Sequence, residues 1–407
     1  MGNTDSRPNI VGVTNGGGVN SKEDDGINAL MKASWEGNLD IVRNLVGQGA
    51  DINAKAKYGG TALIESARNG HLEVVRYLVE QGADINDKDD IGYAAVVEAM
   101  SHVVVVRYLI EQGADVNAKD GSGSTALMRA SQGGDLDSVR WLVEQGADVN
   151  AKDYNSCMAL MKACRYGRLD VARYLVDKAA DVNAKDGNSR TALMEAAYFG
   201  SLDLVRLLVD KAADVNAKDD NGRSALMGGA HFGHLDVVRY LIENQANIEA
   251  RDNTGMTALL LSSLQPRELG LVALPGKLKI VRFLLENGAD TSILNNDGSS
   301  AIMFLMLNDV ANEGKIIAVV KLLLDHGVPL QRNIDGISAR MIAEYKGFLR
   351  ILELLKTYEK RLKATGFSYL ELTEDAGWTG IHPLGTEMSD AVSELLSNDN
   401  MQNVTFY

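Results

Sequence analysis

Apolar residues recur along this chain in paired short runs, with a glycine between the two runs. In the segment from Asp186 to Lys218, apolar positions within each run lie one, three or four residues apart. That spacing places them on one face of a helix, and a glycine between two such runs is typical of a tight turn. The pattern predicts two short helices joined at Gly200, the first with apolar residues Ala192, Leu193, Ala196 and Ala197 and the second with Leu202, Val205, Leu208 and Val209.

The same pair of runs is repeated along most of the chain. A tripeptide ending in Ala-Asp marks each copy, and successive starts are 33, 31, 33, 33, 33, 33 and 43 residues apart, with a degenerate copy after a further 39. One helix pair cannot bury its apolar face alone, so neighbouring copies are expected to stack. The tripeptide starts at Gly49, Gly82, Gly113 and Gly146, in altered form at Ala179, Ala212 and Gln245, again at Gly288, and in the degenerate copy at Gly327.

A 33-residue unit of turn, helix, turn and helix resembles the ankyrin repeat. The family's Thr-Pro-Leu-His motif is replaced here by Thr-Ala-Leu-Met, and the resemblance covers roughly Asp25 to Arg361. It implies an all-α ankyrin-repeat solenoid of about ten helix-turn-helix repeats with short β-hairpin-like loops. The repeats are expected near residues 25–55, 56–88, 89–119, 120–152, 153–185, 186–218, 219–251, 252–294, 295–332 and 333–361.

One position of the second helix carries large apolar side chains in most copies and is expected to face the packing between repeats. The first copy has Asn44 there, and the last copy has Arg340 and Lys356 where other copies have aliphatic residues, so both end copies are interpreted as caps. Insertions at 265–276 and 308–315 are either partner contacts or neutral drift. The large side chains at the shared position are Tyr77, Tyr108, Trp141, Tyr174, Leu207, Tyr240, Phe283 and Leu322.

The charge of the chain argues against nucleic acid as a partner. The net charge is −14, from 41 Lys and Arg against 55 Asp and Glu, whereas a surface that binds phosphate backbones is normally basic. No apolar run approaches the length of a membrane span, and no secretory signal is visible at the N-terminus. Only two cysteines are present, Cys157 and Cys164, which suits a reducing compartment. These observations predict a cytoplasmic protein.

No residue pattern indicates catalysis. No Gly-rich phosphate loop follows a strand, and no nucleophile stands in a recognisable setting with a base, so we expect no enzyme activity, cofactor or metal. His231 and His234 lie three residues apart, but no third ligand is evident. Because His71 and His234 share one repeat position, a structural role is favoured for them.

Partners of ankyrin repeats usually contact the hairpin tips and the exposed positions of the first helix, on the concave face. Just before the turn glycine, three successive copies carry aromatic residues, and aromatic and Arg clusters are the composition of binding hot spots. Tyr198, Phe199 and Phe232 are predicted to anchor a protein or peptide partner, unless these rings pack on neighbouring helices and stabilise the stack instead. The full predicted partner-binding set is Tyr154, Arg165, Tyr166, Arg190, Tyr198, Phe199, Arg223, His231 and Phe232.

The two ends depart from the repeat. Residues 1–24 are polar and Gly-rich and are expected to be disordered, and Met1 to Ser6 fits the N-myristoylation pattern at Gly2. Residues 362–407 form an acidic tail with seven acidic residues against the single basic Lys363. Met388, Ala391, Val392, Leu395 and Leu396 in this tail fall on one face of a short helix, which either docks on the last repeat or serves as a motif for a partner.

Together these features predict a non-catalytic protein-protein interaction scaffold or adaptor, or a structural subunit of a larger assembly, with no preference for an oligomeric state. The alternative is a membrane-associated regulatory or effector protein attached through N-myristoylated Gly2, since a single acyl chain gives only reversible membrane binding. The identity of the partner does not follow from the fold.

Overall fold

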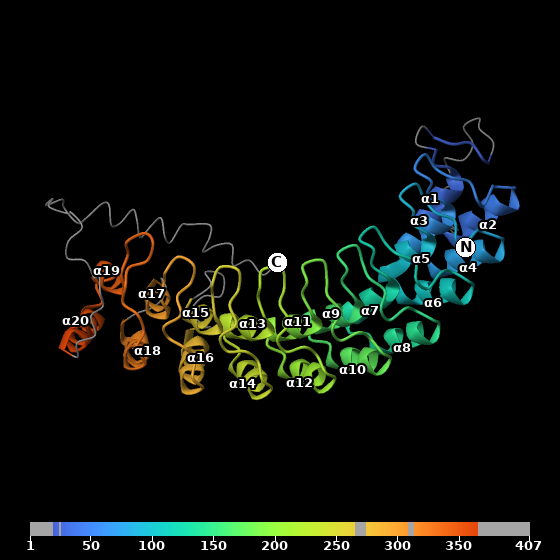
Figure 1. Cartoon of the computed structure of the whole chain (residues 1–407). Helices are drawn as coiled ribbons and strands as arrows, with labels where there is room; N and C mark the ends of the chain where they lie inside the picture. The colour runs from blue at the N-terminus through green and yellow to red at the C-terminus, as the bar shows by residue number, and fades with distance from the viewer. Residues whose placement is uncertain (1–18, 24–25, 265–273, 308–312, 365–407) are drawn as a thin grey trace, which may run out of the picture. The chain divides into compact units, whose positions relative to one another are not determined.

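The computed structural model describes residues 19–23, 26–264, 274–307 and 313–364. The chain divides into two compact units, unit 1 up to Gly187 and unit 2 from Asn188. Throughout these ranges the chain forms helices joined by turns, and the only β-type pairing is two isolated bridges, Lys22 with Asn28 and Lys88 with Ala94. The predicted all-α solenoid of paired helices is therefore confirmed (Figure 1).

Unit 1 comprises the helices up to Gly187. The first helices of successive copies pack against one another, as do the second helices. In the copy that lacks two residues, the first helix is cut to four residues and its last turn is a 3₁₀ helix, η1. The helices are α1 (Ala29–Trp35), α2 (Leu39–Gly47), α3 (Ala62–Arg68), α4 (Leu72–Glu80), α5 (Ala95–Glu98), η1 (Ala99–Ser101), α6 (Val103–Glu111), α7 (Ala126–Gly133), α8 (Leu136–Glu144), α9 (Ala159–Arg165) and α10 (Leu169–Asp177).

Unit 2 continues the same arrangement from Asn188. Helices α11, α13, α15, α17 and α19 form one packed row, and α12, α14, α16, α18 and α20 form the other. Figure 1 shows the two rows of this unit as separate layers. The helices are α11 (Ala192–Tyr198), α12 (Leu202–Asp210), α13 (Ala225–Phe232), α14 (Leu235–Glu243), α15 (Ala258–Ser263), α16 (Leu274–Glu286), α17 (Ala301–Leu307), α18 (Glu313–Asp325), α19 (Ala339–Tyr345) and α20 (Leu349–Ala364).

A hydroxyl side chain caps the start of most of the first helices. The Thr191 hydroxyl accepts the backbone N–H of Met194 at 3.4 Å, and Thr61, Thr125 and Thr257 do the same in their copies. An N-cap of this kind satisfies a backbone donor that the helix itself cannot satisfy, and its loss costs about 1 kcal/mol. Four of the first helices in the described ranges are therefore capped by a threonine.

The turn between the two helices requires glycine for two reasons. Gly200 has a φ of 73°, and a Cβ at this position would lie 2.3 Å from Nδ1 of His234 in the next copy. Nε2 of the same imidazole lies 2.9 Å from the carbonyl oxygen of Tyr198. His71 lies 3.0 Å from the Trp35 carbonyl oxygen in the same way. His71 and His234, each just after a turn glycine, therefore connect their own copy to the first helix of the preceding copy. The structural interpretation is confirmed for both residues.

Arginines of the second helices stack on the ring at the predicted inter-repeat position. The guanidinium of Arg206 lies 5.6 Å from the centroid of the Tyr240 ring, and that of Arg239 lies 4.6 Å from the centroid of Phe283. Stacking of an arginine on an aromatic face contributes about 0.5 to 1 kcal/mol at an exposed site. The large side chains at this position thus join neighbouring repeats, as predicted. Unit 1 has the same contact from Arg43 to Tyr77, Arg76 to Tyr108, Arg107 to Trp141 and Arg140 to Tyr174.

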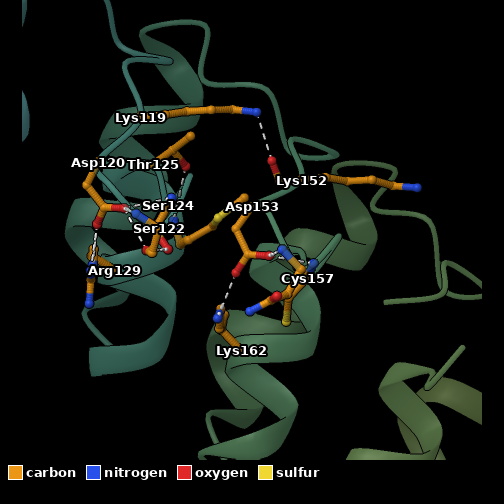
Figure 2. Close-up of polar contacts among 12 residues, drawn as sticks. Lys119, Asp120, Ser122, Ser124, Thr125, Arg129, Lys152, Asp153, Cys157 and Lys162 are labelled. Atoms are coloured by element: carbon orange, nitrogen blue, oxygen red, sulfur yellow. Dashed lines mark hydrogen bonds and ion pairs between the residues drawn. The ribbon is translucent and has the colours of Figure 1, made fainter. Parts of the chain in front are cut away.

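The loop tips are closed by an acidic or amide side chain at their first position. Figure 2 shows two tips of unit 1, at Asp120 and Asp153. Oδ1 of Asp153 accepts the backbone N–H groups of Asn155 and Cys157, at 3.0 and 2.8 Å, and Oδ2 lies 3.0 Å from Nζ of Lys162 in α9. Asp120 pairs with Arg129 of α7 at 2.6 Å. Each tip is therefore fixed to the first helix that follows it.

Several sequence predictions lie outside the described residues. They concern Gly2 and nearly all of the segment 1–24, most of the acidic tail 362–407, and the larger parts of the insertions at 265–276 and 308–315. The proposed end caps lie inside the described ranges, where the side chains of Asn44, Arg340 and Lys356 are all exposed. Their polar side chains therefore face solvent, as expected of a cap.

Candidate functional site

Three rings gather at the ends of two neighbouring first helices in unit 2. Tyr198 ends α11, Phe199 follows it, and Phe232 ends α13. The centroid of Tyr198 lies 4.8 Å from that of Phe199 and 4.1 Å from that of Phe232. These three residues are called the aromatic cluster below. The structure therefore brings together the three predicted anchor residues.

The aromatic cluster is partly packed and partly exposed. Phe199 is 50% exposed, whereas Tyr198 and Phe232 are half-buried. Rings at these separations and tilted angles attract one another by about 0.5 to 1.5 kcal/mol beyond their burial. Tyr198 and Phe232 therefore pack within the stack, while Phe199 presents apolar surface to solvent.

The backbone around the cluster lets the rings approach. Gly200 turns the chain directly after Phe199, and Gly228 of α13 lies against the backbone of Tyr198. A Cβ at Gly228 would meet the Tyr198 backbone at 3.8 Å, which is ordinary contact distance. The corresponding residue of α11 is Glu195, which is buried. A small side chain at position 228 would therefore fit against the Tyr198 backbone.

Two of the predicted partner-binding residues are not on the surface. Arg223 is 5% exposed, and its Nε lies 3.6 Å from Oδ2 of Asp252, the residue that closes the next loop tip. His231 is 2% exposed, and its ring centroid lies 4.7 Å from that of Phe232. The expected exposure of these two side chains is wrong, because each is enclosed by the following repeat. Neither belongs to the surface offered to a partner.

Arg190 is held by the helix that follows it, α11. Its Nη1 lies 3.4 Å from Oε1 of Glu195, which is buried in α11. A guanidinium that neutralises a buried carboxylate has a structural role whether or not it also meets a partner, because removing it would leave that charge uncompensated. Arg190 therefore flanks the aromatic cluster as a support.

The remaining predicted site residues belong to unit 1. Tyr154 lies at a loop tip and is exposed, Arg165 ends α9 and is half-buried, and Tyr166 follows it and is exposed. The backbone N–H of Tyr154 donates to the carbonyl oxygen of Ser122 in the preceding tip, at 3.0 Å. These three residues lie in unit 1, whereas the aromatic cluster lies wholly in unit 2.

A buried polar contact below the aromatic cluster was not expected from the sequence. Lys277, near the start of α16, is 1% exposed, and its Nζ donates to the carbonyl oxygens of Leu261, at 3.3 Å, and Leu264. Burial lowers the pKa of Lys277 to about 7. Burial, and secondarily the charge of Lys277, also lowers the pKa of His231 well below its usual value. A lysine that satisfies carbonyls at the end of α15 takes the place of a glycine cap there.

The described part of the chain contains no group of three or more His, Cys, Asp or Glu side chains arranged to hold a metal ion. Among the helices of that same part, none combines the length and apolar character that a membrane crossing requires. Cys157 and Cys164 are both buried, and burial raises the pKa of the Cys157 thiol.

Comparison with known proteins agrees with this architecture. The family model for ankyrin repeats, which represents three copies, matches residues 7–89, 92–153, 153–219 and 193–274, together more than half of the chain. The crystal structure of the human ASB11 ankyrin repeat domain aligns with a TM-score of 0.47 and 23% identity, covering 54% of this chain and 99% of that domain. A search of curated proteins returns no match.

Proposed function

Since the chain belongs to the ankyrin repeat family, whose repeats are protein-protein interaction modules, we propose that it is a non-catalytic scaffold or adaptor. In this proposal the aromatic cluster of unit 2 holds a protein or peptide partner. The observation that supports it is the half-exposed ring of Phe199, held in place by Tyr198 and through it by Phe232. A ring fixed in this way loses little conformational entropy when a partner covers it.

The charge around the cluster favours a partner that binds through apolar contact. Glu195 is already compensated by Arg190, and Arg223 by Asp252. The exposed part of the cluster is therefore mainly ring surface, and burying a phenylalanine side chain contributes roughly 1.5 to 3 kcal/mol. Binding at this surface should depend only weakly on salt, because screening acts on charges.

Phe199→Ala tests this proposal with the least disturbance of the fold. Tyr198 and Phe232 also stabilise the stack, so their removal would mix two effects, whereas Phe199 is half-exposed. We expect Phe199→Ala to leave the thermal unfolding temperature nearly unchanged and to weaken partner retention about 10-fold or more, from the burial of one ring. Affinity capture from extracts of cells that produce the protein, followed by quantitative mass spectrometry, measures the retention.

Tyr345→Ala is the matched control for this experiment. Tyr345 ends α19 at the repeat position that Tyr198 occupies in α11, and it is exposed. Proteins retained by the wild type and by Tyr345→Ala but released by Phe199→Ala are the expected partners. If Phe199→Ala retains the same proteins in the same amounts, the aromatic cluster is not the binding surface.

The sequence Met1 to Ser6 supports a second role, in which an acyl chain on Gly2 attaches the scaffold to a membrane. Intact mass spectrometry of protein from a eukaryotic source decides between the two. An unmodified Gly2 would remove the membrane-associated alternative and leave a cytoplasmic adaptor.

A further inference from the structure

A groove with a volume of about 380 Å³ crosses the second helices of unit 2. It lies over α14, α16 and α18, in the row opposite to the first helices that carry the aromatic cluster. Its floor is apolar, with Leu235, Leu278, Phe283 and Val319 from all three helices. The first three of these side chains are half-buried, so apolar surface remains open to solvent along the groove.

Cationic side chains surround this apolar floor. Arg239, Lys279, Arg282 and Lys315 line the groove and are all exposed, and Glu286 is the one acidic residue of the lining. The whole chain, by contrast, carries a net charge of −14. The sign of the charge is thus reversed locally, over an apolar strip. This surface is called the basic groove below.

The reversal arises from a change at one repeat position. Six other copies have an acidic residue three positions before the arginine of the second helix, whereas α16 has Lys279 at that position. Lys279 and Arg282 are therefore like charges three residues apart on one helix face, which is unfavourable by a few tenths of a kcal/mol. The equivalent acidic residues are Asp40, Glu73, Asp137, Asp170, Asp203 and Asp236.

Arg282 also lacks the stacking partner that most of these arginines have. The residue equivalent to Phe283 in the next copy is Leu322, so an aliphatic side chain stands where most other copies offer the arginine a ring. Within the described ranges, neither Lys279 nor Arg282 lies within 4 Å of a carboxylate in an ion pair. An anionic partner would relieve the repulsion between the two charges. Aliphatic side chains of the same partner could be buried against the apolar floor of the groove.

The acidic tail of this same chain has the matching composition. Residues 362–407 contain seven acidic residues and one basic residue. Asp390 and Glu394 alternate there with Met388, Ala391, Val392, Leu395 and Leu396. A helix with that spacing has one apolar side beside its carboxylates, which is the complement of an apolar floor with cationic walls.

The tail is also long enough to reach the groove. α20 ends at Ala364, and α20 packs on α18, which packs on α16. Packed helices lie about 8 to 10 Å apart, so the groove is about 20 Å from α20 across the row. Residues 365–387 span at most about 75 Å when fully extended. The connection therefore does not prevent binding.

We propose that residues 388–399 of this chain bind in the basic groove of α14, α16 and α18. Asp390 and Glu394 are then neutralised by the cationic walls, with Lys279 and Arg282 as the principal charges, and the apolar residues of the segment cover Leu278 and Phe283. This places the tail on the second helices before the end of the stack rather than on the last repeat. The first-helix row remains open for a partner at the aromatic cluster.

Glutamate-specific proteolysis of the full chain tests the proposal. The tail offers cleavage after Glu371 and Glu374, before the proposed docking segment, and after Glu387 and Glu394, at its start and within it. We expect cleavage after Glu394 to be about 10-fold slower than after Glu371, because proteolysis follows the population of the undocked state. Lys279→Glu/Arg282→Glu should bring the two rates within about twofold of each other, and about 0.5 M NaCl should shift the wild type in the same direction.

Lys321→Glu/Arg350→Glu is the matched control variant. Lys321 occupies the position of Arg282 in α18 and Arg350 the position of Lys279 in α20, both exposed and outside the groove lining. It changes the net charge by the same amount and should keep the protection of Glu394. Equal cleavage rates in the wild type, protection that survives in Lys279→Glu/Arg282→Glu, or loss of protection in the control variant would each overturn the proposal. Protection that rises with protein concentration would show that a second copy, and not the same chain, supplies the tail.

Discussion

The aromatic cluster and the basic groove are two surfaces of unit 2 that differ in the kind of side chain they leave exposed. At the cluster, the charged neighbours are paired within the fold, Arg190 with Glu195 and Arg223 with Asp252, so ring surface is what remains exposed. At the groove, Lys279 and Arg282 are like charges on one helix face. The difference teaches that a repeat stack makes distinct contact surfaces by changing single positions, since the backbone of each copy is nearly the same.

The largest effect should come from Lys277 of α16, which is buried against the end of α15. Lys279, two residues further along α16, is exposed. Lys277 is buried, and burial lowers its pKa to about 7. In the unfolded chain a lysine keeps its proton to about pH 10.4, so between these values the unfolded state binds more protons and stability rises with pH. We expect the free energy of unfolding of the wild type, relative to Lys277→Met, to increase by roughly 2 to 3 kcal/mol between about pH 7 and about pH 9.

Urea denaturation of both proteins across that pH range measures this difference. Groups common to the wild type and the variant cancel, so the difference reports Lys277 alone. Lys279→Met is the control, because it removes a lysine from the exposed side of the same helix and leaves the buried amine in place. Parallel curves for the wild type and Lys277→Met would show that the buried amine keeps its proton on folding.

The helix pairs were predictable from sequence because the same spacing recurs in nearly every copy. A deviation in one copy does not hide the pattern, because the other copies keep it. The position whose ring joins neighbouring repeats, such as Tyr240 or Phe283, was identified in the same way. The aromatic cluster was predictable for this reason too, because Phe199 and Phe232 stand at equivalent positions of two successive copies and Tyr198 directly precedes Phe199.

The burial of Arg223 and His231 was not predictable from their own positions. Arg223 is buried where it forms an ion pair with Asp252 of the next loop tip, and that contact joins residues of two repeats. Lys277 was missed because it lies in the copy with the ten-residue insertion, where the alignment of positions is lost, and a lysine is ordinarily interpreted as exposed. The charge reversal at Lys279 was readable in the sequence, but its meaning depends on the apolar floor that three helices assemble.

A smaller effect should distinguish the loops that follow the second helices of the two regions. Ala212 follows α12, in the repeat of the cluster, with a φ of 62°, whereas Gly288 follows α16, the central helix of the groove, with a φ of 84°. A residue with a Cβ in the left-handed region is strained by about 1 kcal/mol. We expect Ala212→Gly to raise the free energy of unfolding by about 1 kcal/mol and Gly288→Ala to lower it by a similar amount. Urea denaturation measures both, and a loss of stability in Ala212→Gly would contradict the strain.

The smallest effect should separate two arginines inside the basic groove itself. Arg239 stacks on Phe283 at 4.6 Å from the ring centroid, whereas Arg282 has Leu322 at the equivalent place in the next copy. Arg239→Met keeps an aliphatic stem but deletes the charge, and it should lower the free energy of unfolding by about 0.5 kcal/mol. Arg282→Met should leave stability unchanged or raise it by a few tenths of a kcal/mol, because the repulsion from Lys279 is removed. Urea denaturation at low ionic strength resolves the sign of the difference between the two variants. Equal losses in both would mean that the Arg282 charge is already compensated in the free protein, and the basic groove would then offer less to an acidic segment than its composition suggests.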